Sequence, residues 1–312
     1  MKRLFFFIAV LTTLTFLICF PKQAFLASSE GLKLWFYTVL PSLLPFIILS
    51  DFLIHTGKIP ELLRFSAPFF QKCFGLSVYG SYAFFLGLFC GYPMGAKLTA
   101  DLYRNGKIEK TEAQYLLTFS NNASPMFISS YILLNNLKTP GISMTTFCIL
   151  LLSTMITSLI FRIWYGRFSV PVLPLEKGTE NSKSSWGNLI DMSIMNGFET
   201  ITRLGGYIIL FSIGASMMIR LTGKHKVLAI LLSSTVEITT GIHQISGSSL
   251  SFYLKYLLIL TFTSFGGISA IAQTKGMLSG TPLSLSVYIT GKTVNAVCTF
   301  FLVLLFFIFK II

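Results

Sequence analysis

Long apolar stretches separated by short polar segments make up most of this chain. Several come close to or exceed the roughly 20 apolar residues with which a helix crosses a bilayer. They lie at 4–20, 34–54, 113–134, 142–164, 204–221, 254–274 and 284–309. Two more apolar stretches, at about 77–100 and 227–245, are interrupted by Gly, Pro and Thr. The pattern predicts an all-α polytopic membrane protein in which some transmembrane helices are broken.

Four interruptions fall inside apolar stretches and form two matching pairs. The first half of the chain carries them at 91–95 and 120–125, and the second half at 237–241 and 264–269. Backbone groups without partners cost several kcal/mol in lipid, so such interruptions persist only within protein or beside a water-filled cavity. Interrupted segments at corresponding places in two halves are typical of the binding site of a transporter.

The two halves also align with each other around these interruptions. The aligned positions are Gly31 with Gly197, Gly57 with Gly223, Gly95 with Gly241, and 117–119 with 260–262. We therefore expect a first repeat at 28–165 and a second repeat at 188–312, joined by a linker at 166–187. An N-terminal transmembrane helix at 1–27 precedes them. An uncleaved signal anchor is favoured there over a cleaved signal peptide, because the residues after the apolar run offer only a weak cleavage site.

The distribution of Lys and Arg predicts how the repeats are oriented. Basic residues gather in the cytoplasmic loops of membrane proteins. If 77–100 and 227–245 are re-entrant hairpins, the basic loops at 58–72, 104–110 and 162–183 share one side, which makes the linker cytoplasmic and the repeats inverted. If both segments cross the membrane instead, the repeats are parallel and the basic loops fall on both sides. The asymmetry favours an inverted-repeat helix bundle with two re-entrant hairpins.

Composition narrows the class of protein further. Hydrophobic residues make up 53% of the 312 positions and charged residues only 11%, against roughly 25% charged in soluble domains. The net charge of +13 comes from basic residues that flank membrane spans, so we expect contact with the lipid bilayer and no nucleic-acid partner. The five cysteines form no CxxC pair and the three histidines have no metal-ligand spacing, so neither a metal nor a cofactor is expected.

Sequence motifs of enzymes are missing as well. The chain has no HExxH, no GxSxG and no GxxxxGK[ST] motif. These patterns would supply a zinc site, a nucleophile turn and an ATP-binding loop, respectively. We therefore expect that the protein is not an enzyme and that any transport is not driven by ATP hydrolysis within this chain.

Glu237 is the strongest candidate for chemistry, because it is a carboxylate inside an apolar stretch. Such a group costs roughly 2.5–3.5 kcal/mol at the middle of a membrane, and it usually faces a cavity, pairs with a cation or carries a proton. We expect Glu237 to bind a coupling ion, either H⁺ or Na⁺. The structural alternative is that Glu237 lies near the membrane interface, or that its carboxylate bonds to neighbouring hydroxyl groups and fixes a helix break.

The other polar groups at the interruptions are candidate ligands for a small solute. Amides offer donors and acceptors, glycines let backbone approach closely, and a half-helix that begins near Pro93 would direct N–H groups at an anion. Each group also has a structural alternative. The amides would hydrogen-bond the interrupted backbone, the small residues would serve helix packing, and Lys97 would extend its ammonium towards the lipid headgroups. The expected substrate-binding residues are Gly91, Tyr92, Pro93, Lys97, Asn121, Asn122, Ser124, Thr239, Thr240, Ser264, Gly266, Gly267, Ser269 and Gln273.

Polar residues in two other stretches are secondary candidates. Glu199 and Arg203 are four positions apart and would pair on one helix face, which favours a structural role. Lys292 and Asn295 lie in the last apolar stretch and would face the interior of the bundle.

The motifs in combination resemble the sporulation integral membrane protein YlbJ family. They are CGYPMGAK at 90–97, DLY at 101–103, FSNN with SP at 119–125, EITTG at 237–241, and SFGGIS through Gln273 at 264–273. The similarity runs from about Gly31 to the C-terminus. Proteins of this family contain the Gate or nucleoside-recognition domain, which is related to concentrative nucleoside transporters. The resemblance implies an inverted-repeat bundle with two hairpins, and movement of dipicolinic acid across the outer forespore membrane during sporulation.

Dipicolinate is a small aromatic dianion, which helix N-termini, amides and hydroxyls would suit and on which Tyr92 would stack. Glu237 does not suit a dianion directly, so it would bind the coupling ion, or hold Lys97 or an amide in place. The chain is shorter than usual family members, which leaves the substrate open. The alternatives are a carrier of nucleosides or another polar solute, and a non-transporting membrane scaffold in sporulation. A homo-oligomer is compatible with each of them.

Overall fold

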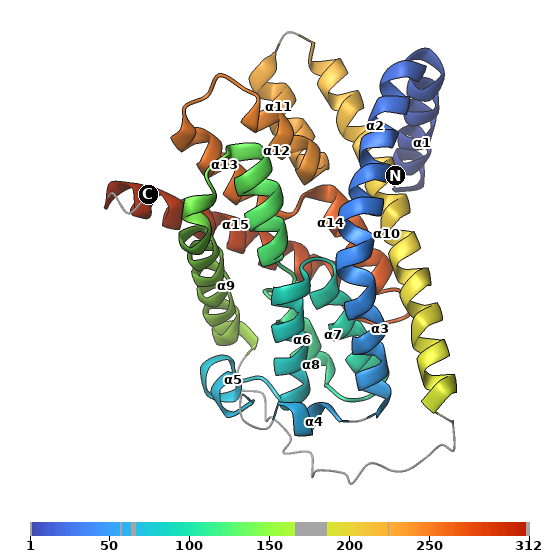
Figure 1. Ribbon diagram of the computed structural model, residues 1–312, viewed down its shortest axis with the longest axis vertical. Coiled ribbons are helices and arrows are strands. Elements are labelled where there is room, and N and C mark those ends of the chain that lie inside the picture. The colour runs from blue at the N-terminus through green and yellow to red at the C-terminus, as the bar shows by residue number, and fades with distance from the viewer. Residues whose placement is uncertain (1, 57, 64–66, 166–185, 224, 310–312) are drawn as a thin grey trace.

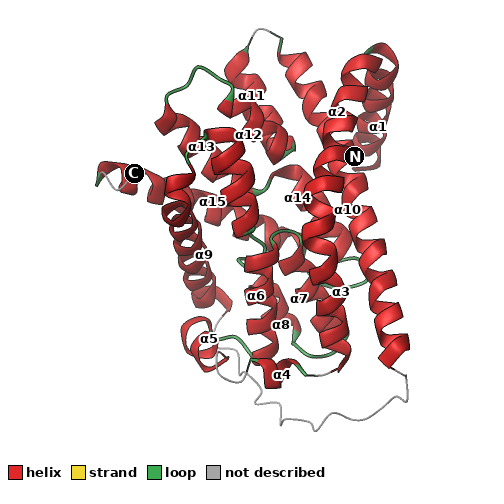
Figure 2. Ribbon diagram, viewed as in Figure 1, coloured by secondary structure: helices red, strands yellow, loops and turns green. Residues whose placement is uncertain are grey.

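The computed structural model describes residues 2–56, 58–63, 67–165, 186–223 and 225–309, and its regular elements there are helices (Figure 1, Figure 2). In the first half they are α1 (Lys2–Cys19), α2 (Pro21–Leu34), η1 (Trp35–Val39), α3 (Leu40–Thr56), α4 (Ile59–Leu62), α5 (Ala67–Phe74), α6 (Val78–Cys90), α7 (Met94–Arg104), α8 (Lys110–Leu117), η2 (Phe127–Leu137), η3 (Pro140–Ile142) and α9 (Ser143–Tyr165). In the second half they are α10 (Trp186–Thr222), α11 (Lys226–Val236), α12 (Ile238–Ser246), α13 (Phe252–Phe265), α14 (Gly267–Met277) and α15 (Leu285–Ile308). The predicted linker at 166–187 falls almost entirely outside the described residues.

Several helices in the described part of the chain are long and apolar enough to cross a membrane. Four qualify singly, over Pro140–Tyr165, Trp186–Thr222, Phe252–Met277 and Leu285–Ile308, and the number reaches six if two sharply bent helix pairs each count as a span. Large apolar side chains such as Ile163 and Trp164 point outward, with 82% and 77% of their surface exposed. Such surfaces require lipid rather than water. The prediction of an all-α polytopic membrane protein is therefore confirmed.

The N-terminal region differs from the expected single helix at 1–27. α1 ends at Cys19, the chain bends by 110°, and α2 begins at Pro21. Proline lacks the N–H that would continue α1, and it is well suited to the first turn of a new helix. Residues 21–27 thus belong to α2, which continues through the short π-helical segment η1 into α3.

This long helix, α2 to α3, runs antiparallel to α10 (Figure 1). The aligned glycines lie at the contact between the two. A Cβ on Gly31 would lie 3.1 Å from the Cα of Ile209, and a Cβ on Gly197 would lie 2.7 Å from Cγ1 of Ile48. Each glycine therefore lets the long helix of the other half approach closely, as expected for equivalent positions of an inverted pair.

α10 starts well before the predicted span at 204–221, because helical hydrogen bonding extends back to Trp186. The segment around Glu199 therefore lies within the body of α10. The predicted ion pair between Glu199 and Arg203 does form on one face of α10.

After its long helix, each half contains the same further elements in the opposite direction. A helical hairpin comes first, α6–α7 or α11–α12, followed by a broken helix, α8–η2 or α13–α14, and a final helix, α9 or α15. In Figure 1 the first hairpin enters the bundle from the lower end and the second from the upper end. We call residues 91–93 the first tip and residues 118–124 the first break. In the second half, Glu237 is the second tip and Gly266 is the second break.

Candidate solute-binding site

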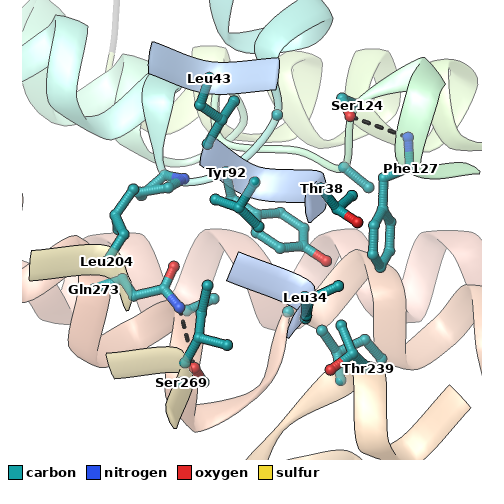
Figure 3. Close-up of a pocket in the computed structure, with 18 of the residues that line it drawn as sticks. Leu34, Thr38, Leu43, Tyr92, Ser124, Phe127, Leu204, Thr239, Ser269 and Gln273 are labelled. Atoms are coloured by element: carbon teal, nitrogen blue, oxygen red, sulfur yellow. Dashed lines mark hydrogen bonds between the residues drawn. The ribbon is translucent and has the colours of Figure 1, made fainter. Parts of the chain in front are cut away.

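Both tips and both breaks meet around a cavity of about 100 Å³ between the two repeats (Figure 3). Each of the four interruptions supplies part of the lining. Their contributions are Gly91, Tyr92 and Pro93 from the first tip, Ala123 and Ser124 from the first break, Glu237 from the second tip, and Gly266 from the second break. Segments that are far apart in the sequence are thereby brought to one place.

The lining of the cavity is mainly apolar, and most of its polar groups belong to one set of elements, called the polar wall below. The polar wall consists of the tips and breaks together with Ser269 and Gln273 of α14. The long helices form the opposite wall through Leu34, Thr38, Val39, Leu43, Leu204 and Ile208. No Lys or Arg is among the lining residues that the structure describes, and Glu237 is the carboxylate there. A solute would thus contact hydroxyls, an amide, an aromatic ring and one acid.

Close backbone packing explains why glycines occupy the first tip. Gly91 has φ +88°, a backbone conformation that residues other than glycine rarely adopt. A Cβ there would also lie 2.9 Å from the Ser124 nitrogen. A Cβ on Gly95 would lie 2.0 Å from the carbonyl oxygen of Ser120. The first tip therefore rests on the first break backbone to backbone, which places Tyr92 at the cavity.

Tyr92 extends into the space between Thr38 and Leu34 (Figure 3). Its hydroxyl is buried and has no hydrogen-bond partner within the described residues. A buried polar group without a partner costs about 1–3 kcal/mol. Binding of a solute or water that accepts a hydrogen bond from the Tyr92 hydroxyl would therefore be favourable. The Tyr92 ring makes an edge contact with Phe127 at 6.3 Å between centroids, and Phe127 stacks on Tyr131 at 5.1 Å.

Glu237 caps the helix that follows it. Its carboxylate accepts hydrogen bonds from the backbone nitrogens of Thr239 (3.1 Å) and Thr240 (2.8 Å) and from the Thr239 hydroxyl. A negative charge at this end of α12 is favourable, because the N-terminal N–H groups of a helix carry partial positive charge. No basic side chain lies within 4.0 Å of it among the described residues. The structural alternative in which Glu237 fixes a helix break is thus realised, while the residue also lines the cavity.

The two asparagines of the first break bond to other protein groups and do not line the cavity. Asn121 Nδ2 donates to the hydroxyls of Thr274 and Tyr288, each at 3.2 Å. Asn122 Nδ2 donates to the carbonyl of Phe119 at 2.7 Å, and its Oδ1 accepts from Asn295 at 3.2 Å. The bond to Phe119 stays within the first break, and the other three join the first repeat to α14 and α15 of the second.

The structure brings some of the expected substrate-binding residues to the cavity and leaves others outside it. Those that line it are Gly91, Tyr92, Pro93, Ser124, Thr239, Gly266, Ser269 and Gln273, with Glu237 beside them. Those outside its lining are Lys97, Asn121, Asn122, Thr240, Ser264 and Gly267. Asn122 and Ser264 instead line a second, much smaller cavity of about 10 Å³. A polar residue at an interruption therefore does not necessarily have its side chain in the cavity lining.

The structure places Lys97 outside the cavity lining. Its Nζ donates to Oδ2 of Asp101 at 2.6 Å, and Arg104 Nη1 donates to Oδ1 of the same carboxylate at 2.7 Å. Arg104 Nη2 also donates to the carbonyls of Met277 (2.7 Å) and Ser279 (2.6 Å) at the end of α14. Because Asp101 lies one helical turn on from Lys97, the lysine pairs there and reaches neither the cavity nor Glu237.

Some residues near the cavity were not expected from the sequence. Phe127 lines it, and Tyr131 donates to the Thr239 carbonyl at 3.0 Å, which joins the first broken helix to the second tip. Ser124, Phe127 and Tyr131 follow the i, i+3, i+7 spacing of one helix face, and this spacing was an available signal. Thr38 gave none, because its position depends on how the long helix packs. Across the described residues, no group of three or more His, Cys, Asp and Glu is placed to hold a metal ion.

Comparison with known proteins gives one informative match. The sporulation integral membrane protein YlbJ of Bacillus subtilis (strain 168) is 27% identical over 313 aligned positions, which cover 90% of this chain and 76% of the relative. No family model matches the chain. No solved structure matches it either. The similarity extends over both repeats, so this chain, a multi-pass integral membrane protein, is similar to the sporulation integral membrane protein YlbJ over nearly its whole length.

Proposed function

We propose that this protein is a secondary transporter that moves a small organic solute through the cavity between its repeats. The observation that carries the proposal is the meeting of both hairpin tips and both helix breaks around that cavity. Interrupted helices at a protein-lined cavity between inverted repeats are the usual binding geometry of secondary transporters. By the family resemblance, the solute is dipicolinic acid and the membrane is the outer forespore membrane.

The polar wall supports an aromatic acid as the solute. The Tyr92 hydroxyl is a donor without a partner in the described chain, and its ring offers a surface for stacking. Ser124 Oγ accepts from the Phe127 nitrogen at 3.2 Å and keeps its own proton for a ligand. Gln273 Nε2 donates one proton to Ser269 Oγ at 3.1 Å and has a second proton to offer. Carboxylate oxygens would accept from these groups.

The charge of the lining supports a second candidate, a neutral polar aromatic solute such as a nucleoside. The described lining carries no Lys or Arg, and the Glu237 carboxylate disfavours a nearby anion. An anionic solute would need an accompanying H⁺ or Na⁺, and Glu237 is the residue that we propose to bind it. A neutral solute would need no such partner. The proposal involves no enzymatic reaction, and it is compatible with a monomer or a homo-oligomer.

Uptake into proteoliposomes tests the proposal. We expect labelled dipicolinate to accumulate, and Tyr92→Phe, which removes one hydroxyl, to raise KM about fivefold, consistent with loss of one hydrogen bond of about 1 kcal/mol. Tyr37→Phe is the matched control, because Tyr37 is 74% exposed on the surface. Uptake of uridine in place of dipicolinate would favour the second candidate. If neither solute moves, transport is rejected in favour of a membrane scaffold in sporulation.

A further inference from the structure

Lys292 is a buried cation that the proposed binding site does not use. It lies about one third of the way along α15, and only 1% of its surface is exposed. Its Nζ donates to the backbone carbonyl oxygen of Asn121 at 2.9 Å. In the described part of the chain no carboxylate lies within 4.0 Å of it. A lysine in the membrane interior is expensive and marks a functional position by default.

The acceptor of this bond belongs to the first break. Helix α8 ends at Leu117, and the next helical turn begins with Pro125, which has no N–H to donate to a carbonyl before it. The carbonyl of Asn121 therefore needs a donor from elsewhere, because an unpaired carbonyl costs free energy in a dry interior. The ammonium group of Lys292 supplies that donor from the other repeat.

One face of α15 is adapted to this contact. A Cβ on Gly291 would lie 2.4 Å from the Cα and carbonyl oxygen of Thr118, so the absence of a side chain lets α15 lie directly against the break. Tyr288, one turn earlier, contacts Asn121, and Asn295, nearly one turn later, contacts Asn122. Lys292 is at the centre of this face.

The segment that Lys292 holds leads directly into the cavity wall. Ser124 and Phe127 follow Asn121 by three and six positions, and both line the cavity. The first tip rests on the same segment, since a Cβ on Gly91 would touch the Ser124 nitrogen. A shift of the Asn121 carbonyl would therefore move Ser124, Phe127 and the base of Tyr92 together.

We propose that Lys292 is a positioning residue of the solute site. Its ammonium acts as the missing backbone donor at the first break and thereby keeps Ser124 and Phe127 in the cavity wall. The transport readout of this inference rests on the proposed function, whereas its labelling readout does not. Because the role is to donate a hydrogen bond, glutamine, a neutral donor one bond shorter, should replace the lysine.

Three substitutions separate hydrogen bonding from charge. Lys292→Gln keeps a donor without charge, Lys292→Arg keeps both, and Lys292→Met keeps neither. Lys255→Met is the matched control, because Lys255 also donates to a backbone carbonyl, that of Ser246 at 2.8 Å, but away from the cavity lining. Melting temperatures of the full-length variants in detergent identify any variant that fails to fold.

The first measurement is the rate at which N-ethylmaleimide labels Ser124→Cys, after the five native cysteines are replaced by alanine. We expect Lys292→Met to change this rate at least threefold, and Lys292→Gln, Lys292→Arg and Lys255→Met to leave it within twofold. An unchanged rate in Lys292→Met overturns the inference, whether or not the protein transports anything.

The second measurement is dipicolinate uptake. We expect Lys292→Met to raise KM at least tenfold, which corresponds to about 1.4 kcal/mol, while Lys292→Gln stays within threefold of the wild type. If Lys292→Gln fails as Lys292→Met does while Lys292→Arg is active, positive charge is what matters and the positioning role is rejected. A wild-type protein that moves no solute contradicts the proposed function, and the labelling rates then decide this inference alone.

Discussion

Two interruptions, the second tip and the first break, lie in different repeats and are satisfied with opposite chemistry. At the second tip, a carboxylate of the same segment, Glu237, accepts from the free N–H groups of α12. At the first break, a cation from the other repeat, Lys292, donates to a free carbonyl after α8. Each charge complements the nearby helix end, since N-termini carry partial positive and C-termini partial negative charge. An interrupted helix thus needs a partner for its backbone, and the sign of the partner depends on which end is exposed.

The second tip and the first break also differ in how far each depends on the other repeat. The second tip is completed by residues within a few positions of Glu237. The first break depends on Thr274, Tyr288 and Lys292, all from the second repeat. We infer that disturbance of the second repeat would alter the first break, whereas the capping of the second tip is local.

The largest expected effect comes from the glycines where tip and neighbouring backbone touch. A Cβ on Gly95 would lie 2.0 Å from the Ser120 carbonyl oxygen, and a Cβ on Gly241 would lie 2.4 Å from the Ser234 Cα. Because backbone cannot move aside easily, Gly95→Ala and Gly241→Ala should each destabilise by about 3 kcal/mol, at the upper end of overpacking. Thermal denaturation in detergent measures this.

Gly141→Ala is the control, because nothing lies within 4 Å of a Cβ at Gly141 and its φ is not in the left-handed region. Equal melting temperatures for Gly95→Ala and Gly141→Ala would show that the first tip does not rest on the break. A tolerated change at Gly241 alone would break the equivalence of the two repeats.

A middle-sized effect is expected at Glu237. Glu237→Ala removes the cap of α12 and should cost about 1–2 kcal/mol in thermal denaturation, since two backbone N–H groups lose their acceptor. Glu237→Gln keeps one acceptor oxygen and should cost less than half of that. If Glu237 also binds the coupling ion, Glu237→Gln should remove the pH or sodium dependence of uptake while the protein remains folded. If uptake by Glu237→Gln still depends on pH or sodium, Glu237 serves only as the cap of α12.

The smallest effects are expected at Arg104, a partly exposed contact between the repeats, and at a surface ion pair. Arg104→Ala removes the hydrogen bonds to the carbonyls of Met277 and Ser279 and the ion pair with Asp101, and should cost about 1 kcal/mol, with Arg104→Lys in between, because lysine lacks the planar fork. Lys58→Ala breaks an exposed pair with Glu61, whose side chains are 59% and 73% exposed, and should change stability by less than about 0.5 kcal/mol. Equal losses in melting temperature would mean that Arg104 does not connect the repeats.

The sequence by itself determined the class of fold and the positions of the interruptions. Apolar stretches long enough for a bilayer require helices, because unpaired backbone is too costly in lipid. Gly91, Pro93, Pro125 and Gly266 mark interruptions through local conformational rules that hold in any fold. The alignment of Gly31 with Gly197 was also visible, since close helix contact leaves a glycine on each side.

Only the tertiary structure decided which polar groups reach the cavity. Lys97 and Asn121 have the same residue-level signals as Tyr92 and Ser124, yet Lys97 pairs with Asp101 and Asn121 bonds to α14 and α15. Thr38 and Lys292 gain their roles from helices that are distant in the chain. The physical reason is that a buried polar group hydrogen-bonds with whichever donor or acceptor lies near it. The packing between the repeats determines which groups lie near each other.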